Sequence, residues 1–441
     1  MAINGMTLSN QESSDEAWFL LSLTQSTFQS DSTKATLMSL PRIILALWCS
    51  MLFSVQVSAD VPLAEQFLLD GKTKAGAIAL ADRLSEHPDD NQARFGLGVV
   101  QFVGAVDRLG QNFYQYGLRD VSNSLGNMIP LLRLPVPQNP NPETLTYEDS
   151  RRILQAFIDD LAIADATLAK VDDSLVKLPL HVTGIKLDFV GNGSDPVALQ
   201  TILKSMRAVR DDRDLFVVFD RADVTWLRGY CHLLSGICEF VLAHDGQEIF
   251  DSTAQLFFQK VKSPYPYLQE GRRVFDWAGQ FDIADAIAFI HLIRMPVKEP
   301  ERMKAALKHL ETVLEYSGEM WRFALAETDN DHEWIPNPKQ QGELGLSVSQ
   351  AMIDSWLLAA KEGTEVLQGK RLIPFWRGNG DRGVNLHRVF TEPTSFDLVL
   401  WIQGTAAAPY LEQGDMTRPE VWARMQQVFQ GNFIVFALWF N

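Results

Sequence analysis

The residues best suited to chemistry are four carboxylates that follow the end of a predicted long helix: Glu327, Asp329, Asp331 and Glu333. Asp329, Asp331 and Glu333 alternate along the chain, so an extended or looped backbone could direct their oxygens toward one point. Hard cations such as Ca²⁺ bind several oxygens arranged in this way. The stretch is therefore a candidate site for a metal or a substrate.

A complete calcium-binding hand is excluded here, because it would need Gly in place of Trp334 and Glu in place of Gln340. A solvated acidic helix end is the alternative interpretation. Acidic residues at a helix C-terminus oppose the helix dipole, which costs a few tenths of a kcal/mol each and favours a bound cation or an arginine partner. Both a cofactor-free protein and a Ca²⁺ site remain open, and no catalytic residue is assigned.

A second polar feature is a loop in which Gly378, Gly380 and Gly383 spell G-x-G-x-x-G. A dinucleotide site would also need a long helix after the loop and a ribose-binding acid, and both are missing. Arg377 and Arg382 frame these glycines, so the loop could hold an anion or pair with the acidic stretch. A tight turn without any ligand is the other interpretation. The chain contains no His-Glu-x-x-His motif, no nucleophile elbow and no Cys/His metal spacing.

The elements that must position these side chains are mostly helices. Apolar periodicity and proline punctuation predict helices at 61–70, 72–84, from 91 onward, 147–170, 220–244, 249–261, 282–295, 299–326, 347–368 and 419–429. Thr146 and Asp149 form a predicted capping box, and Asp195 with Pro196 predicts a further helix start. The fold class is therefore mainly α, with antiparallel helical hairpins packed on a larger helical part.

Two segments depart from the helical pattern. Alternating apolar residues in 176–189, on either side of Thr183-Gly184, predict a small β-hairpin. From Leu372 the chain becomes irregular and rich in aromatic residues, and we expect the runs Leu398–Ile402 and Phe433–Phe440 to be buried.

Within the predicted helix 220–244, four polar residues recur at helical spacing on one face: Arg228, His232, Ser235 and Glu239. They could form a paired polar face against a solvent crevice. A ligand-facing stripe inside a helical bundle is the other interpretation.

Residues 61–108 carry small and turn residues at informative positions: Gly71 between two helices, Gly76 at a close-packing position, Pro88 at the end of the unit, and Leu97-Gly98 in the next helix. In this pattern the segment resembles a tetratricopeptide repeat, over about one and a half repeats. It departs from the family at Arg83, where Ala is usual. The resemblance implies a stack of helix pairs that could bind a protein partner or a small ligand; an ordinary helical hairpin is the alternative.

The remainder, for example Phe219–Glu239 and Asp331–Pro338, resembles exported bacterial proteins without an assigned activity. We expect an exported, soluble helical protein that acts in binding or assembly, with its specific function and oligomeric state unknown.

The alternative function is that of a secreted carbohydrate-active enzyme, a glycosidase or lyase of the α/α-toroid type. Such enzymes pair carboxylates as general acid and base and stack sugars on tryptophans. Here the carboxylates would be Asp329, Asp331 and Glu333, with Trp334 and Trp376 as platforms. The irregular segment after Leu372 argues against a regular toroid.

The compartment is predicted from a 13-residue apolar run, Ile43–Val55, which follows Arg42 and precedes Val57-Ser58-Ala59. These are the parts of a secretory signal peptide, and the run is too short to span a membrane. We predict a signal peptide at 38–59 with Met38 as initiator, and interpret residues 1–37 as disordered or a mis-annotated extension. The predicted domains are then 60–129, tetratricopeptide-like, and 146–441, the main helical part.

The net charge and the cysteine positions limit which partners and cross-links we expect. Cleavage after Ala59 would leave 382 residues with a net charge of −14, which would repel nucleic acid, so we expect no nucleic-acid partner. After cleavage we also expect no membrane span, and a periplasmic or extracellular location. Cys231 and Cys238 lie seven residues apart in one helix, too far for a disulfide, and should be free buried thiols.

Overall fold

The computed structural model describes residues 61–120, 129–205, 212–269, 283–345, 347–378 and 380–429, with positions 433, 436 and 437. The predictions for residues 1–59 and for most of the run Phe433–Phe440 lie outside these residues. Ala59–Asn441 forms one compact unit.

The described chain is mainly helical, as predicted, and its strands form only short antiparallel ladders. The α-helices are α1 (Leu63–Asp70), α2 (Thr73–Glu86), α3 (Asn91–Gln115), α4 (Tyr147–Leu168), α5 (Leu199–Ser205), α6 (Arg221–Ala243), α7 (Gln247–Thr253), α8 (Ile283–Leu292), α9 (Pro300–Ala324), α10 (Gln350–Leu367), α11 (Leu386–Thr391), α12 (Leu398–Gln403) and α13 (Pro419–Phe429). The 3₁₀ helices are η2 (Pro130–Arg133), η3 (Val182–Gly184), η4 (Ala254–Leu256), η5 (Pro266–Leu268) and η6 (Thr405–Tyr410).

The strands are β1 (Leu178–His181), β2 (Lys186–Leu187), β3 (Val197–Ala198), β4 (Phe216–Phe219), β5 (Arg294–Met295), β6 (Ile373–Pro374), β7 (Gly383–Val384), β8 (Phe396–Asp397) and β9 (Leu411–Glu412). They pair as β1–β4, β2–β3 and β5–β8, and β6, β7 and β9 form a three-stranded sheet.

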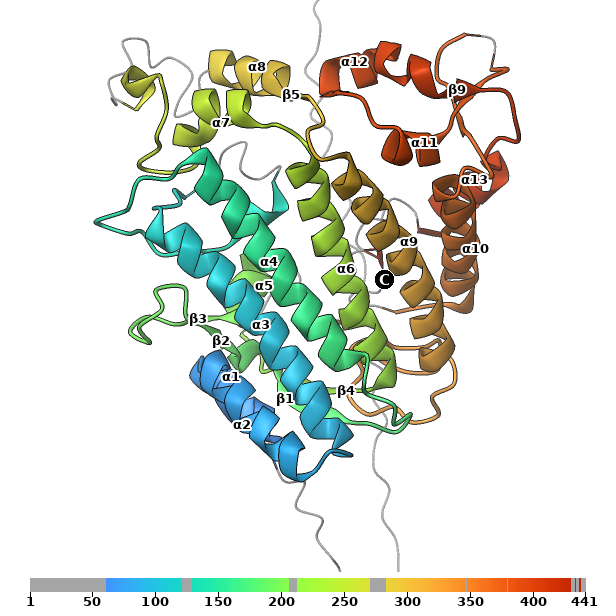
Figure 1. The fold of residues 1–441 in the computed structure, drawn as a ribbon. Helices are drawn as coiled ribbons and strands as arrows, with labels where there is room; N and C mark the ends of the chain where they lie inside the picture. Colours follow the sequence, from blue (N-terminus) through green and yellow to red (C-terminus); the bar gives the residue numbers. More distant parts are fainter. Residues whose placement is uncertain are drawn as a thin grey trace, which may run out of the picture. The chain divides into compact units, whose positions relative to one another are not determined.

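The long helices lie side by side in the order α3, α4, α6, α9 and α10, and α6 with α9 makes the most extensive contact (Figure 1). Trp321 of α9 is fully buried, in a core cluster that includes residues of α10 and α13. Cys231 and Cys238 of α6 are free and buried, as predicted. Among the described residues, no helix combines the length and apolarity that a membrane span requires.

The N-terminal helices pack as antiparallel hairpins. Gly71 takes the left-handed conformation (φ 69°) that closes α1. A Cβ at Gly76 would lie 2.7 Å from the Cβ of Phe67, so only glycine allows α1 and α2 to approach this closely. Helices packed as hairpins in this way are compatible with a helical-repeat fold.

The predicted hairpin within residues 176–189 is wrong in its pairing. Strand β1 pairs with β4, with Leu178 opposite Phe219, and β2 pairs with β3, with Leu187 opposite Val197. Neither residue of the Thr183-Gly184 turn has the positive φ of a two-residue hairpin turn; both lie in η3. The segment therefore joins two separate ladders.

Two further expectations need correction. The helix predicted at Asp195-Pro196 begins only at Leu199, because Val197 and Ala198 first pair with β2 as strand β3. The run Leu398–Ile402 is a short surface helix, α12, and Ile402 is 69% exposed. Its six residues are too few to form a helix with a fully covered face.

The packing of α3 can be tested at two glycines of the same helix. A Cβ at Gly110 would lie 2.1 Å from Cδ1 of the buried Phe189, whereas a Cβ at Gly104 would make an ordinary 3.5 Å contact with Thr73. We expect Gly110→Ala to lower the free energy of unfolding by about 1–3 kcal/mol through overpacking. Gly104→Ala should raise it by roughly 0.5–1 kcal/mol through helix propensity. Chemical denaturation measures both, and equal effects would contradict this packing.

Candidate functional site

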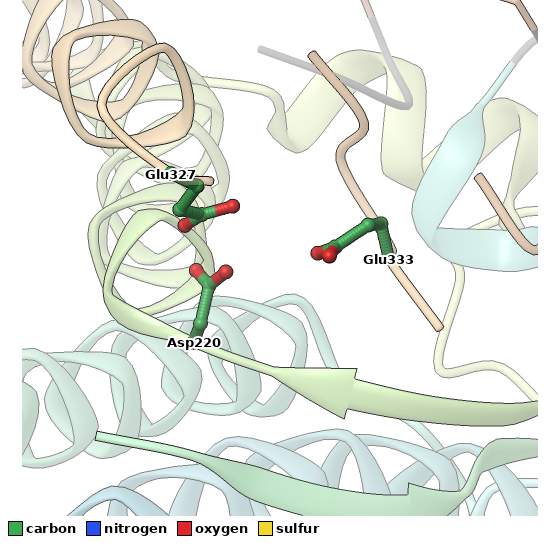
Figure 2. A group of neighbouring side chains, drawn as sticks. All are labelled: Asp220, Glu327 and Glu333. Atoms are coloured by element: carbon green, nitrogen blue, oxygen red, sulfur yellow. The ribbon is translucent and has the colours of Figure 1, made fainter. Parts of the chain in front are cut away.

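Three carboxylates from distant parts of the chain converge at one end of the α6–α9 pair. Single oxygens of Asp220, Glu327 and Glu333 all lie within 4.8 Å of one another (Figure 2). Asp220 stands between β4 and α6, Glu327 follows the end of α9, and Glu333 projects from the loop beyond it. We name these three residues the carboxylate cluster.

Asp220 is positioned by its role as the N-cap of α6. Its carboxylate accepts a hydrogen bond from the Ala222 N–H at 2.7 Å. It also accepts one from the Asp223 N–H at 3.4 Å, and the Asp220 N–H donates in return to the Asp223 side chain at 2.9 Å. This reciprocal pair is a capping box. Strand β4, paired with β1, holds the residue from the other side, so Asp220 is only 5% exposed.

Glu327 and Glu333 are positioned by a loop that folds back under the end of α9. The Asn337 side-chain amide donates to the last helical carbonyl, that of Ala324, at 2.9 Å. The Gln340 amide donates to Glu327 at 3.3 Å and to Glu333 at 3.1 Å, and so holds both carboxylates together. His332, between them in the chain, has a φ of 58°, an uncommon conformation for a residue other than glycine.

Burial and the closeness of like charges raise the pKa values of carboxyl groups in and beside the cluster. Burial raises the pKa of Glu327 far above its usual range, and so do the hydrogen bond that its protonated form donates to Asp220 and the repulsion by the charge of Asp220. Burial and the charge of Asp220 likewise raise the pKa of Asp223, and burial raises that of Glu333, against a hydrogen bond from the Asp331 N–H. Lys177 is a nearby cation, but its Nζ is paired with Asp329 at 2.8 Å.

This arrangement can do two things chemically. Without a cation, the carboxyl groups must share protons, because ionised carboxylates at this separation repel in a medium of low polarity. With a cation, all three can be ionised. The donor atoms are all oxygens, which suits a hard cation such as Ca²⁺ rather than a softer transition metal.

The structure separates the four carboxylates that the sequence grouped. Glu327 and Glu333 enter the cluster, whereas Asp329 is exposed and bonded to Lys177, which lowers its pKa. Asp331 is exposed and contributes its backbone N–H to Glu333 at 2.8 Å.

The other predicted site residues lie elsewhere or are inaccessible. Trp334, proposed as a sugar platform, is only 4% exposed, whereas Trp376 is 51% exposed. Arg377 and Arg382 are exposed in the loop that joins β6 to β7, where the Cδ of Arg377 lies near Gly404, at the start of η6. That loop belongs to the β6–β7–β9 sheet, away from the loop that carries Glu327 and Glu333.

The residues that the sequence analysis missed are Asp220 and Asp223. The spacing Asp-x-x-Asp before an apolar run is an N-cap signal, but it does not indicate the proximity of Glu327, more than 100 residues away in the sequence. Asp223 is 3% exposed, and its Oδ1 has no hydrogen-bond partner within the described part of the chain.

The polar face of α6 is a set of ion pairs and hydrogen bonds with its neighbours. The Arg228 guanidinium binds Asp165 of α4 at 2.7 Å, and Glu239 binds Arg302 of α9 at 2.9 Å. Nδ1 of His232 lies 2.7 Å from Nδ1 of His309, whose pKa burial lowers to about 4. Of the two interpretations of this face, the geometry corresponds to paired polar groups rather than a ligand-facing stripe. The contacts join α4, α6 and α9.

The raised carboxyl pKa values predict how stability depends on pH in the presence of a chelator. A carboxyl whose pKa is higher in the folded protein binds its proton more tightly there, so stability falls as pH rises above the unfolded value, about 4.3 for Glu. We expect the free energy of unfolding to fall from about pH 5 upward. Glu327→Gln, which can still donate to Asp220, should reduce this slope by up to ~1.4 kcal/mol per pH unit.

Denaturation at several pH values measures this slope. Asp331→Asn is the matched control, because Asp331 lies in the same loop outside the cluster and should leave the slope unchanged. A wild-type slope in Glu327→Gln would contradict the assignment of the bound proton to Glu327.

Comparison with known proteins gives no further identification. No protein-family model matches the chain, and neither a curated protein nor a solved structure matches it.

Proposed function

We propose that this protein is an exported helical binding protein whose fold is completed by a hard divalent cation, Ca²⁺, at the carboxylate cluster. The observation that carries the proposal is the convergence of Asp220, Glu327 and Glu333, with oxygens within 4.8 Å of one another. Such a concentration of buried negative charge is stable only when protons or a cation neutralise it.

The donor set favours calcium among the hard cations. Ligand oxygens lie about 2.3–2.6 Å from Ca²⁺, so oxygens that are within 4.8 Å of one another can share one ion. Mg²⁺ requires near-ideal octahedral geometry at about 2.0–2.1 Å and usually keeps several waters, so a site built from three protein carboxylates suits it less well. Asp223, which caps α6 together with Asp220, has an unpartnered Oδ1 and is a further carboxyl group beside the cluster.

Burial argues for binding rather than glycan hydrolysis. Glu333 is 1% exposed and Asp220 is 5% exposed, and Glu327 is half-buried. A polysaccharide could therefore not reach a pair of these carboxylates without a large opening of the site. The tetratricopeptide-like hairpins at 61–108 support a role in binding or assembly, because stacked helix pairs of that kind present surfaces for partners. The signal-like segment before Ala59 supports export.

A cation at this site should stabilise the folded protein. We expect Ca²⁺ at 100 times its dissociation constant to add about 2.7 kcal/mol to the free energy of unfolding, with a smaller effect of Mg²⁺ and reversal by EDTA. In Glu333→Gln the Ca²⁺ effect should be lost, whereas its stability in EDTA should equal or exceed that of the wild type, because a buried charge has been removed. Thermal unfolding with and without each ion measures these effects.

Asp331→Asn again serves as the control and should keep the full Ca²⁺ effect. If neither ion shifts the unfolding of the wild type, or if Glu333→Gln retains the shift, the carboxylates only share protons and the metal proposal fails.

Export makes a separate prediction. The protein recovered from outside the cytoplasm should begin at Asp60, because Val57-Ser58-Ala59 supplies the small residues that signal peptidase requires. N-terminal sequencing of the recovered protein measures this directly. An unprocessed chain in the cytosol would remove the export part of the proposal and leave the cation site untouched.

A further inference from the structure

A cavity of about 660 Å³ lies between α9, α10, α11 and α13. Its walls are formed largely by apolar side chains: Leu314, Val366, Leu367, Ile373, Leu386 and Trp422. Its volume falls within the range of about 300–1,000 Å³ that is usual for small-molecule sites. It shares no residue with the carboxylate cluster.

The buried polar groups beside the cavity are hydrogen-bonded within the protein, and Gln426, also in the wall, is exposed to solvent. Thr417, in the cavity wall, donates its hydroxyl to Glu362 at 2.8 Å and accepts a hydrogen bond from Nε1 of Trp422 at 2.8 Å. Glu362 is fully buried and also accepts from the Arg418 N–H at 2.7 Å and from its guanidinium Nε at 2.8 Å. The charges behind the wall are therefore paired with each other and leave none for a ligand.

Two small residues shape the cavity. Gly363 lies inside α10, where glycine costs a helix up to ~1 kcal/mol relative to alanine, and a Cβ there would approach Cδ1 of Leu314 at 3.4 Å. Ala423 lies on an exposed part of α13, next to Trp422, which is 39% exposed. The cavity is therefore open to solvent beside α13, and larger side chains at either position would fill it.

We propose that this cavity binds a neutral, lipophilic small molecule of the long-chain alcohol or ester type. Water gains little in an apolar cavity, because it needs two to four polar partners. A hydrocarbon chain would instead cover the exposed apolar wall and make contacts that water cannot. A charged head group would be disfavoured, since the neighbouring Arg418 and Glu362 already neutralise each other. This inference goes beyond the proposed cation site and does not depend on it.

The test uses the purified protein and the neutral fluorescent probe N-phenyl-1-naphthylamine, with 1-dodecanol, dodecanoate and dodecylammonium as competitors. We expect saturable binding of the probe, displaced by 1-dodecanol at least ten times more effectively than by either ion. Gly363→Leu and Ala423→Trp should each weaken probe binding at least tenfold by filling the cavity. Ala423 is exposed, so its substitution should leave folding intact even if Gly363→Leu does not fold.

Two control variants separate this cavity from general hydrophobic binding. Gly318→Leu places the same side chain at a glycine in α9 whose Cβ would meet no atom within 4 Å, and Ile402→Ser removes an apolar residue that is 69% exposed on α12. Both should bind the probe within twofold of the wild type. The proposal is overturned by any of four results: no saturable binding, wild-type binding in Ala423→Trp, loss of binding in Ile402→Ser, or equal displacement by the charged competitors.

Discussion

Buried negative charge at the junction of α6 and α9 is the constraint on which the rest of the structure depends. Asp220 caps the N-terminus of α6, where the helix dipole and backbone N–H groups stabilise an anion. Glu327 lies just past the C-terminus of α9, where the dipole opposes an anion. The two antiparallel helices thus bring together one carboxylate whose ionised form is stabilised and one whose ionised form is not. A proton on Glu327 or a cation between the two resolves this conflict.

The position of this junction also determines the packing of the core beside it. Trp334 and Ile335 follow Glu333 directly and enter the same core cluster as Trp321 of α9. A loop that placed Glu333 differently would withdraw both apolar side chains from that core. Along the rest of α6, paired charges such as Arg228–Asp165 and Glu239–Arg302 add to the apolar contacts with α4 and α9. Breaking one of these half-buried pairs would leave a charge without its partner, so the helices are held in register as well as together.

The sequence predicted features that depend on neighbouring residues and missed those that depend on contacts between distant parts of the chain. The capping box of α4, the start of α6 at Asp220 and the bounds of α13 follow from neighbouring residues, and all three appear as expected. The hairpin within 176–189 was wrong because β1 has its partner more than 30 residues further on, at β4, and alternation alone does not identify a partner. Glu327 and Glu333 were recognisable as an acidic group, but Asp220 became their neighbour only through the packing of α6 on α9. The sequence also did not indicate that α12 is exposed. Its apolar run resembles a buried segment in sequence, but it lies at the surface.

Among the described residues no disulfide links distant parts of the chain, so a cation at the carboxylate cluster would be a long-range link of another kind. The proposed export would bring the protein into oxidising conditions, in which disulfides commonly stabilise folds, yet Cys231 and Cys238 are both free and buried in one helix. A cation bound by Asp220, Glu327 and Glu333 would join segments more than 100 residues apart and restrict the folded chain as a long-range disulfide does. Unlike a disulfide, such a link exists only when the carboxylates are ionised and the ion is abundant, so it forms outside the cytoplasm more readily than within it. Under the proposed export, a chain that gains this link outside the cytoplasm would complete its fold there.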